Sequence, residues 1–146
     1  MSFFDSINIS ASALTAETLR MDIISKNIAN ANTTRTANGT PYRRQVVVFQ
    51  EDKKLPFSSY LNSELTRFNK GGVKATAVIE DKSDFKMVYN PGHPDADERG
   101  YVKMPNVDIM IEMVNMISAT RAYDANITSI NSTKSIIMKA LDIGRI

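Results

Sequence analysis

The residues best suited to chemistry lie together in His93-Pro94-Asp95-Ala96-Asp97-Glu98. One imidazole and several carboxylates are the ligand types found in zinc and calcium sites. However, proline disfavours the helical display of such ligands, and a lone histidine among acids in a Gly/Pro-rich loop usually belongs to a solvated turn. The pattern therefore favours a turn, and a small metal-dependent hydrolase that uses this loop is the catalytic alternative.

The rest of the sequence offers no better start for catalysis. There is no cysteine, which excludes a disulfide framework, a thiolate metal site and a cysteine nucleophile. There is also no Gly-x-Ser-x-Gly motif and no phosphate-binding loop. We expect a protein that is not an enzyme and that binds neither a metal nor a cofactor.

Charge and hydropathy exclude two further classes of partner. The net charge of +2 is too small to indicate nucleic-acid binding, and basic residues alternate with acidic ones instead of forming one patch. No apolar run approaches the roughly 18 residues of a membrane span. Because Met1–Asp5 has neither a basic nor an apolar signal region, we expect neither membrane insertion nor a cleaved Sec-type signal peptide.

Helix-breaking residues divide the chain of 146 residues into three segments. All five prolines and five of the six glycines lie between residues 31 and 106. We therefore expect a helical segment at 1–34, a β-containing insertion at 35–105 and a second helical segment at 106–146.

The first segment has the pattern of one long amphipathic helix over Phe4–Asn30. Apolar residues recur every seven positions, and small residues occupy the complementary positions, which is the coiled-coil spacing. Such a helix would be about 38 Å long, more than a small domain can cover with its own chain. Three asparagines supply the expected stop signal. The apolar, small and asparagine positions are Ile7, Leu14, Met21 and Ile28; Ala11, Thr18 and Ser25; and Asn27, Asn30 and Asn32.

The last segment predicts a second helix over Val107–Ile143. Apolar positions step by threes and fours for over 30 residues without proline or glycine, which is typical of a coiled coil or an oligomer element. Pro105 fits a helix start, and Asn106 or Asp108 is the expected N-cap. Core packing is the favoured interpretation of the Met110, Met113 and Met116 stripe at its beginning, and a surface that adapts to non-identical neighbours is the alternative.

The middle segment predicts short strands. Asn38-Gly39 is a turn signal, and β-rich runs follow at 43–50, 73–80 and 84–89. The expected fold is mainly α, with two long terminal helices that form a coiled-coil-like layer and short antiparallel strands between them.

Both ends resemble the signatures of the flagellar rod and hook protein family. The N-terminal motif comprises Ala13-Leu14, Arg20-Met21-Asp22 and Asn27–Thr33. The C-terminal motif comprises Asn106-Val107-Asp108, Glu112-Met113, Met116 and Ala119–Asn126. Between them, Tyr89–Asp97 and Gly100-Tyr101-Val102 look like the segment typical of one short member, a proximal-rod protein.

The resemblance implies a structural subunit of the flagellar basal-body rod, which transmits torque across the periplasm. Its expected partners are other rod proteins, further copies of itself, basal-body ring or hook-junction components, and the flagellar type III apparatus that exports such proteins unprocessed. Polymerisation through the terminal helices is the implied mechanism. A self-contained helical adaptor that stays monomeric is the alternative.

Polar residues within the helical patterns have competing interpretations. Asn27, Asn30 and Asn32 mark either a recognition element for export or a subunit contact, or else a helix end followed by a turn, with the helix end favoured. For Glu112 we favour a solvated face, and for Arg121 a contact between subunits. The residues expected at subunit interfaces are Ile7, Ala11, Leu14, Thr18, Met21, Ile28, Asn30, Met113, Ile117, Arg121, Tyr123, Asn126, Ile127 and Ile130.

Overall fold

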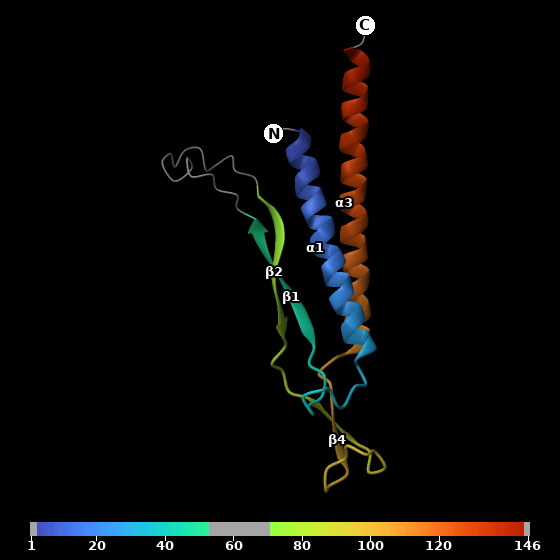
Figure 1. The fold of residues 1–146 in the computed structure, drawn as a ribbon. Coiled ribbons are helices and arrows are strands. Elements are labelled where there is room, and N and C mark those ends of the chain that lie inside the picture. Colours follow the sequence, from blue (N-terminus) through green and yellow to red (C-terminus); the bar gives the residue numbers. More distant parts are fainter. Residues whose placement is uncertain (1–2, 53–70, 145–146) are drawn as a thin grey trace, which may run out of the picture. The chain divides into compact units, whose positions relative to one another are not determined.

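The computed structural model describes residues 3–52 and 71–144. Two long helices, α1 (Phe3–Ala29) and α3 (Ile109–Ile143), enclose four strands in the chain order. The strands are β1 (Gln45–Asp52), β2 (Gly72–Glu80), β3 (Lys86–Tyr89) and β4 (Tyr101–Met104) (Figure 1). The expected fold class, mainly helical with a small β insertion, is confirmed. Neither described helix is long and apolar enough to cross a membrane.

Helix α1 ends where the asparagine-rich stretch predicted, but only one asparagine closes it. Both the backbone N–H and the side-chain amide of Asn30 donate to the carbonyl of Lys26, at 3.1 and 2.9 Å. Lys26 in the last turn and Asp5 in the first also suit the helix dipole. Asn27 instead lies inside the helix and is fully buried, so its interpretation as a helix end is wrong.

Helix α3 begins at a capped N-terminus. The Asp108 Oδ1 atom accepts hydrogen bonds from the backbone N–H groups of Met110 and Ile111, at 3.0 and 3.4 Å. Asp108 is therefore the N-cap, which confirms one of the two expected candidates. The Ile111 hydrogen bond and the nearby Lys86 ammonium lower the Asp108 pKa below its ordinary value. With 35 residues, α3 is about 52 Å long.

The strands form two separate pairs. β1 pairs with β2, and β3 pairs antiparallel with β4, with Lys86 opposite Met104 and Tyr89 opposite Tyr101. The three predicted strands correspond to β1, β2 and β3. β4 was not predicted; it follows Gly100, whose φ of 80° turns the chain back toward β3. The rings of Tyr89 and Tyr101 then meet edge to face, with centroids 5.3 Å apart.

The chain divides into two compact units. Unit 1 consists of Met1–Leu19, Phe49–Thr76 and Thr120–Ile146, and unit 2 of Arg20–Val48 and Ala77–Ala119. Among the described residues, unit 1 buries Ser10 and Ala16. Unit 2 buries many more side chains, including Ile24, Asn27, Ala31, Tyr42, Val102, Val107, Glu112 and Ala119.

Within unit 1, strand β2 begins in close contact with α1. The Val73 N–H donates to the Ser12 hydroxyl at 3.0 Å, and a Cβ atom on Gly72 would lie 2.2 Å from the same oxygen. The Ser12 hydroxyl in turn donates to the Ile9 carbonyl at 2.7 Å. Only glycine permits this approach of strand and helix.

Candidate functional site

Unit 2 is organised around the side-chain amide of Asn27, which is 0% exposed. Its Nδ2 donates to the Gln45 carbonyl at 2.8 Å and to Glu112 Oε2 at 2.9 Å. Its Oδ1 accepts from the Tyr42 hydroxyl and from the Gln45 N–H, both at 2.9 Å. All four hydrogen-bonding positions of the amide are thus used, and each partner comes from outside α1.

Glu112 of α3 is the other buried centre of the same network. Its side chain is 1% exposed, and its Oε1 accepts from Arg44 Nε at 2.9 Å and from Arg44 Nη2 at 2.7 Å. The Arg44 side chain retains 25% exposure. The solvated face expected for Glu112 is therefore wrong. Because a buried carboxylate is stable only when paired and hydrogen-bonded, Asn27 and Arg44 make its burial possible.

A second set of contacts fixes the backbone beside Arg44. The Arg44 N–H donates to Asn106 Oδ1 at 2.8 Å, and the Arg44 carbonyl accepts from the Asp81 N–H at 2.8 Å. The Asn106 Nδ2 donates to Ser83 Oγ at 2.8 Å. Arg43 Nη1 donates to the Asp81 and Ser83 carbonyls, both at 3.1 Å. Asn106 therefore fastens the approach to α3 onto the insertion instead of capping the helix.

We call Asn27, Tyr42, Arg44, Gln45 and Glu112 the buried network. Burial and the neighbouring Glu112 and Glu80 carboxylates raise the Tyr42 pKa above its ordinary value. At the edge of the network, hydrogen bonds from Ser83 lower the Asp81 pKa, and Arg44 contributes to the same effect. The side chains of Asn27, Tyr42, Arg44 and Glu112 and the backbone of Gln45 are held by one another, so the arrangement joins α1, β1 and α3.

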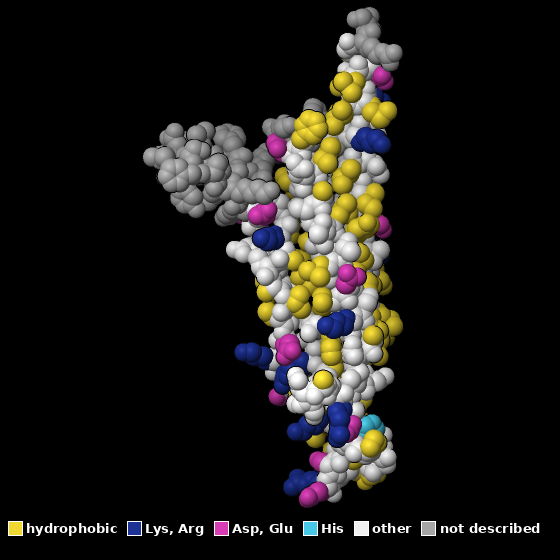
Figure 2. Space-filling model, viewed as in Figure 1, with side chains coloured by type: hydrophobic (Ala, Val, Ile, Leu, Met, Phe, Trp, Pro, Cys, Tyr) yellow, Lys and Arg dark blue, Asp and Glu magenta, His cyan; other side chains and the backbone are white. Residues whose placement is uncertain are grey.

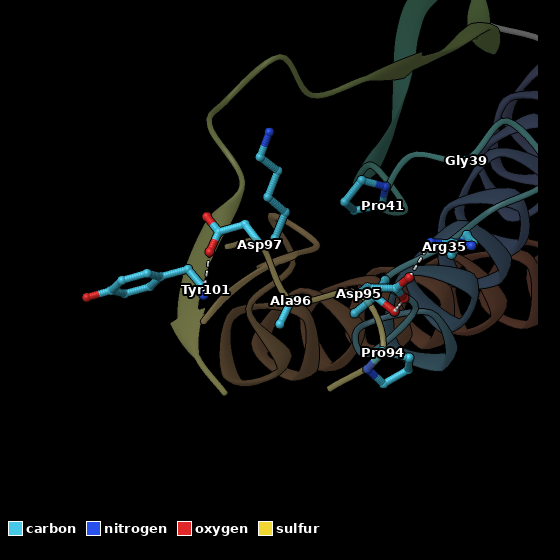
Figure 3. Close-up of a pocket in the computed structure, with 10 residues that line it drawn as sticks. Arg35, Gly39, Pro41, Pro94, Asp95, Ala96, Asp97 and Tyr101 are labelled. Atoms are coloured by element: carbon cyan, nitrogen blue, oxygen red, sulfur yellow. Dashed lines mark hydrogen bonds and ion pairs between the residues drawn. The ribbon is translucent and has the colours of Figure 1, made fainter. Parts of the chain in front are cut away.

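The carboxylates of the acidic loop that could have bound a metal are engaged in contacts within the protein. Asp95 accepts a hydrogen bond from Thr34 at 2.8 Å and pairs with Arg35 at 2.6 Å. Asp97 Oδ1 accepts from the N–H groups of Arg99 and Tyr101 at 2.9 and 2.8 Å. In Figure 3 the Asp95 carboxylate points toward Arg35, while the Tyr101 ring points away from both. Among the described residues, no group of three or more His, Cys, Asp or Glu side chains is placed to hold a metal ion.

The residues expected at subunit interfaces are all at least partly accessible within this single chain. Ala11, Thr18, Met113, Ile117 and Arg121 are exposed. The others are half-buried: Ile7, Leu14, Met21, Ile28, Asn30, Tyr123, Asn126, Ile127 and Ile130. Asn126 is also held by its own helix, because its Nδ2 donates to the Ala122 carbonyl at 2.8 Å. Their contacts with other subunits stay a prediction.

Helix α3 carries a large apolar surface that the described chain does not cover. Met110 is 71% exposed and Met113 is 48% exposed, so core packing is the wrong interpretation for both. Figure 2 shows hydrophobic side chains at the surface along the helical part of the molecule. The large exposed apolar residues of α3 are Ile109, Met110, Ile111, Met113, Val114, Ile117, Ile136, Met138, Leu141 and Ile143. Isolated exposed apolar residues are ordinary, but a set this large on one helix indicates an interaction surface.

Sequence patterns missed the structural role of Tyr42 and Arg44. Arg44 lies 68 residues from Glu112 along the chain, so no local periodicity connects them. In the structure, Glu112 lies seven residues before Ala119, which is completely buried, so both occupy the same face of α3.

Comparisons with known proteins place this architecture among flagellar rod proteins. Residues 7–35 match the family described as flagella basal body rod protein, and residues 98–143 match the family described as flagellar basal body rod FlgEFG protein C-terminal. The flagellar basal-body rod protein FlgC of Bacillus subtilis is 50% identical, over 99% of this chain and 100% of its own length. The FlgC proteins of Borreliella burgdorferi and Salmonella typhimurium are 46% and 42% identical, over 98% and 99% of this chain and 98% and 100% of their own.

Proposed function

The chain belongs to the FlgC family of flagellar basal-body rod proteins and is a structural subunit of that rod, and we propose that it joins its neighbours through α1 and α3. The observation that carries the proposal is the uncovered apolar surface of α3, from Met110 to Ile143. Within the proposal, residues 1–34 and 106–146 build the core of the rod. Residues 35–105, of which 53–70 lie outside the described part, build an outer insertion.

Apolar burial supplies the free energy of this assembly. Covering an exposed leucine, isoleucine or methionine side chain contributes about 1.5–3 kcal/mol. Leu141 and Ile143 are 68% and 75% exposed, so a neighbouring helix that covers them gains a large part of that value for each. Many such contacts in parallel give a tube that resists torsion, which is what torque transmission requires.

The buried network gives each subunit a defined geometry on which this assembly depends. Asn27 and Glu112 join α1 to α3 by a hydrogen bond of 2.9 Å, and Asn27 joins α1 to the first residue of β1. These hydrogen bonds therefore fix the position at which the insertion connects to the two helices. A rod built from such subunits transmits rotation through joints in which the buried Asn27 and Glu112 side chains are hydrogen-bonded.

The proposed partners are other rod proteins, further copies of this chain, and components of the basal-body rings or the hook junction. Export by the flagellar type III apparatus and a place in the periplasmic part of the rod complete the proposal. The fully paired buried network and the folded acidic loop support a mechanical function over a catalytic one.

Charge reversal at Arg121 tests the proposed interface. Arg121 is exposed on α3, so Arg121→Glu leaves the circular dichroism of the monomer unchanged. We expect the variant to be absent from purified basal bodies and the cells to lose motility. The matched control is Lys82→Glu, an exposed charge reversal in the insertion, which leaves assembly intact.

Three results would contradict the proposal. Normal incorporation of Arg121→Glu would remove α3 from the interface at this position. An equal loss of helix signal and incorporation would assign Arg121 to folding of the subunit. A chain that stays monomeric in sedimentation and does not cross-link to other rod components would instead be a self-contained adaptor.

A further inference from the structure

We propose that Asn38 is a site of spontaneous covalent modification, at which the side-chain amide is lost and an aspartate or an isoaspartate forms. The backbone nitrogen of Gly39 closes a five-membered ring on the Asn38 side chain, and water then opens that ring. This chemistry needs no neighbouring subunit. It follows from the order of the two residues in the sequence, from their exposure, and from the hydrogen bonds of the turn in which they lie.

The sequence places a reactive pair at one position. Asn38 is the one asparagine of the sequence that precedes a glycine. Ring closure requires the nitrogen of the next residue to approach the Asn38 Cγ atom, and a side chain on that next residue hinders the approach. Glycine has no side chain, so an Asn-Gly pair closes more readily than other pairs. Asn90, by contrast, precedes Pro91, whose nitrogen carries no hydrogen to lose.

The folded chain leaves both residues of the pair accessible. Asn38 and Gly39 are exposed, and a Cβ atom on Gly39 would have no neighbouring atom within 4 Å. Water and hydroxide can therefore reach the Asn38 amide. The turn also requires this glycine, because Gly39 has a φ of 74°. The fold thus keeps a reactive pair at the surface.

Hydrogen bonds of the turn restrain the nitrogen that attacks. The Gly39 N–H donates to the Thr36 carbonyl at 2.9 Å. The Thr36 N–H and hydroxyl both donate to the Thr40 carbonyl, at 2.9 and 2.8 Å, which closes a three-residue loop. Ring closure removes the hydrogen from the Gly39 nitrogen, so its bond to Thr36 must break first. Since one such hydrogen bond shifts an equilibrium by about fivefold, folding slows the reaction by about that factor.

The reaction needs only water and hydroxide. Hydroxide removes the proton of the Gly39 nitrogen, this nitrogen bonds to Asn38 Cγ, and the Asn38 Nδ2 takes up a proton from water and leaves as ammonia. Water then adds to one of the two ring carbonyls. Breaking the bond from the nitrogen to Cγ gives an aspartate. Breaking the bond from the nitrogen to the backbone carbonyl carbon gives an isoaspartate, in which the main chain runs through Cβ and Cγ.

The modified turn leads directly to the buried network. The Tyr42 N–H donates to the Thr33 carbonyl at 3.1 Å and closes the loop that contains Asn38. The Tyr42 hydroxyl in turn donates to Asn27 at 2.9 Å. An isoaspartate lengthens the main chain of this loop, whereas an aspartate adds only a charge. Isoaspartate therefore disturbs the position of Tyr42, and aspartate does not.

Incubation of the full-length protein at mildly alkaline pH tests the site. Trypsin releases residues 36–43, whose one asparagine is Asn38. We expect this peptide to gain about one dalton with time, through the loss of ammonia and the gain of water, and to become a substrate of protein isoaspartyl methyltransferase. The matched control is Asn38→Gln, which must close a less favourable six-membered ring and should stay unmodified. An unchanged mass of the unsubstituted peptide, in protein incubated folded or in guanidinium chloride, would overturn the proposal.

Asn131 provides a control within the same molecule. The next residue, Ser132, has a side chain, and its nitrogen lies inside α3, where the helix binds its hydrogen. We expect Asn131 to stay intact in the folded protein while Asn38 reacts. Equal reaction at both positions would show that the Asn-Gly pair has no special reactivity, and would also overturn the proposal.

Two comparisons test the restraint that the turn imposes. In guanidinium chloride we expect residues 36–43 to react about fivefold faster than in the folded protein. Thr36→Val removes the hydroxyl that binds the Thr40 carbonyl, so it should speed the reaction in the folded protein and leave the unfolded rate unchanged. Equal rates in folded and unfolded protein would refute the restraint, as would a Thr36→Val effect of the same size in both.

The effect on the fold is measured against a variant of matched charge. Protein that has reacted at Asn38 is separated from unreacted protein by ion exchange and compared with freshly prepared Asn38→Asp. We expect the reacted protein to unfold at a lower guanidinium chloride concentration, because only it contains isoaspartate. Equal midpoints would show that the longer main chain does not reach Tyr42, and would refute the predicted disturbance.

Discussion

Replacing Glu112 with leucine removes the acceptor on which both Asn27 and Arg44 depend. The Asn27 Nδ2 retains the Gln45 carbonyl but loses its second acceptor, and the Arg44 guanidinium retains a contact to Asp81 at 3.5 Å. Removing one partner of a buried pair costs about 3–5 kcal/mol. Because Arg44 is 25% exposed and water can reach it, we expect the lower end, about 3 kcal/mol.

A glutamine at the same position separates charge from shape. The carboxylate accepts on both oxygens, from Asn27 at one and Arg44 at the other. In either orientation, the glutamine amide places a donor against one of these donors. We therefore expect Glu112→Gln to lose about 2 kcal/mol, since a hydrogen bond to a charged group contributes about 1.5–3 kcal/mol.

A double-mutant cycle measures the contact itself. We expect Glu112→Leu and Arg44→Met to be less than additive by about 2 kcal/mol in urea unfolding followed by circular dichroism. The matched control is the exposed pair of Lys86 and Asp108, which are 3.4 Å apart and 52% and 46% exposed. Its coupling should be several-fold smaller. Additive losses at Glu112 and Arg44 would refute the direct coupling that the structure shows.

Further predictions concern pH and close packing. Because the pKa values of Asp81 and Asp108 are lowered in the folded protein, the unfolded chain takes up protons first as the pH falls. The stabilisation by these two carboxylates is therefore present above about pH 4 and is lost below it. Replacing both, by Asp81→Asn and Asp108→Asn, should flatten the acid limb of a curve of stability against pH. The raised pKa of Tyr42 acts in the opposite sense, because the unfolded chain loses its proton first. Its stabilisation is therefore lost as the pH rises above its ordinary value of 10.0, and Tyr42→Phe should make the alkaline limb shallower. Gly72→Ala places a methyl group 2.2 Å from the Ser12 hydroxyl; it should speed hydrogen exchange in β2, and Ser12→Gly should partly restore protection.

Local patterns were sufficient for the elements but not for the network. The predicted helices at 4–30 and 107–143 agree with α1 and α3 to within two residues at each end, because apolar periodicity and the absence of breakers act locally. β4 was missed because it forms through its pairing with β3 across the intervening loop, and that pairing is not a local pattern.

The misassigned residues share one physical cause. Asn27 and Glu112 are polar residues in a helical pattern, and sequence alone favours the surface or a helix end for both. What buries them is a set of partners elsewhere in the chain: Glu112 lies 85 positions after Asn27, and Gln45 lies 18 positions after it. The enclosing fold must be known before such partners can be identified.

The buried network also resolves an ambiguity that the heptad pattern leaves open. Repeats of seven, such as Ile7, Leu14, Met21 and Ile28, match a partner helix equally well after a slip of seven residues. If α3 slipped by one heptad, Ala119 would replace Glu112 opposite Asn27, and a buried amide hydrogen would lose its acceptor at a cost of about 1–3 kcal/mol. The Arg44 guanidinium would lose its buried carboxylate as well. The apolar spacing therefore makes helix pairing favourable, whereas Asn27 and Glu112 select the one register in which the insertion and both helices fit together.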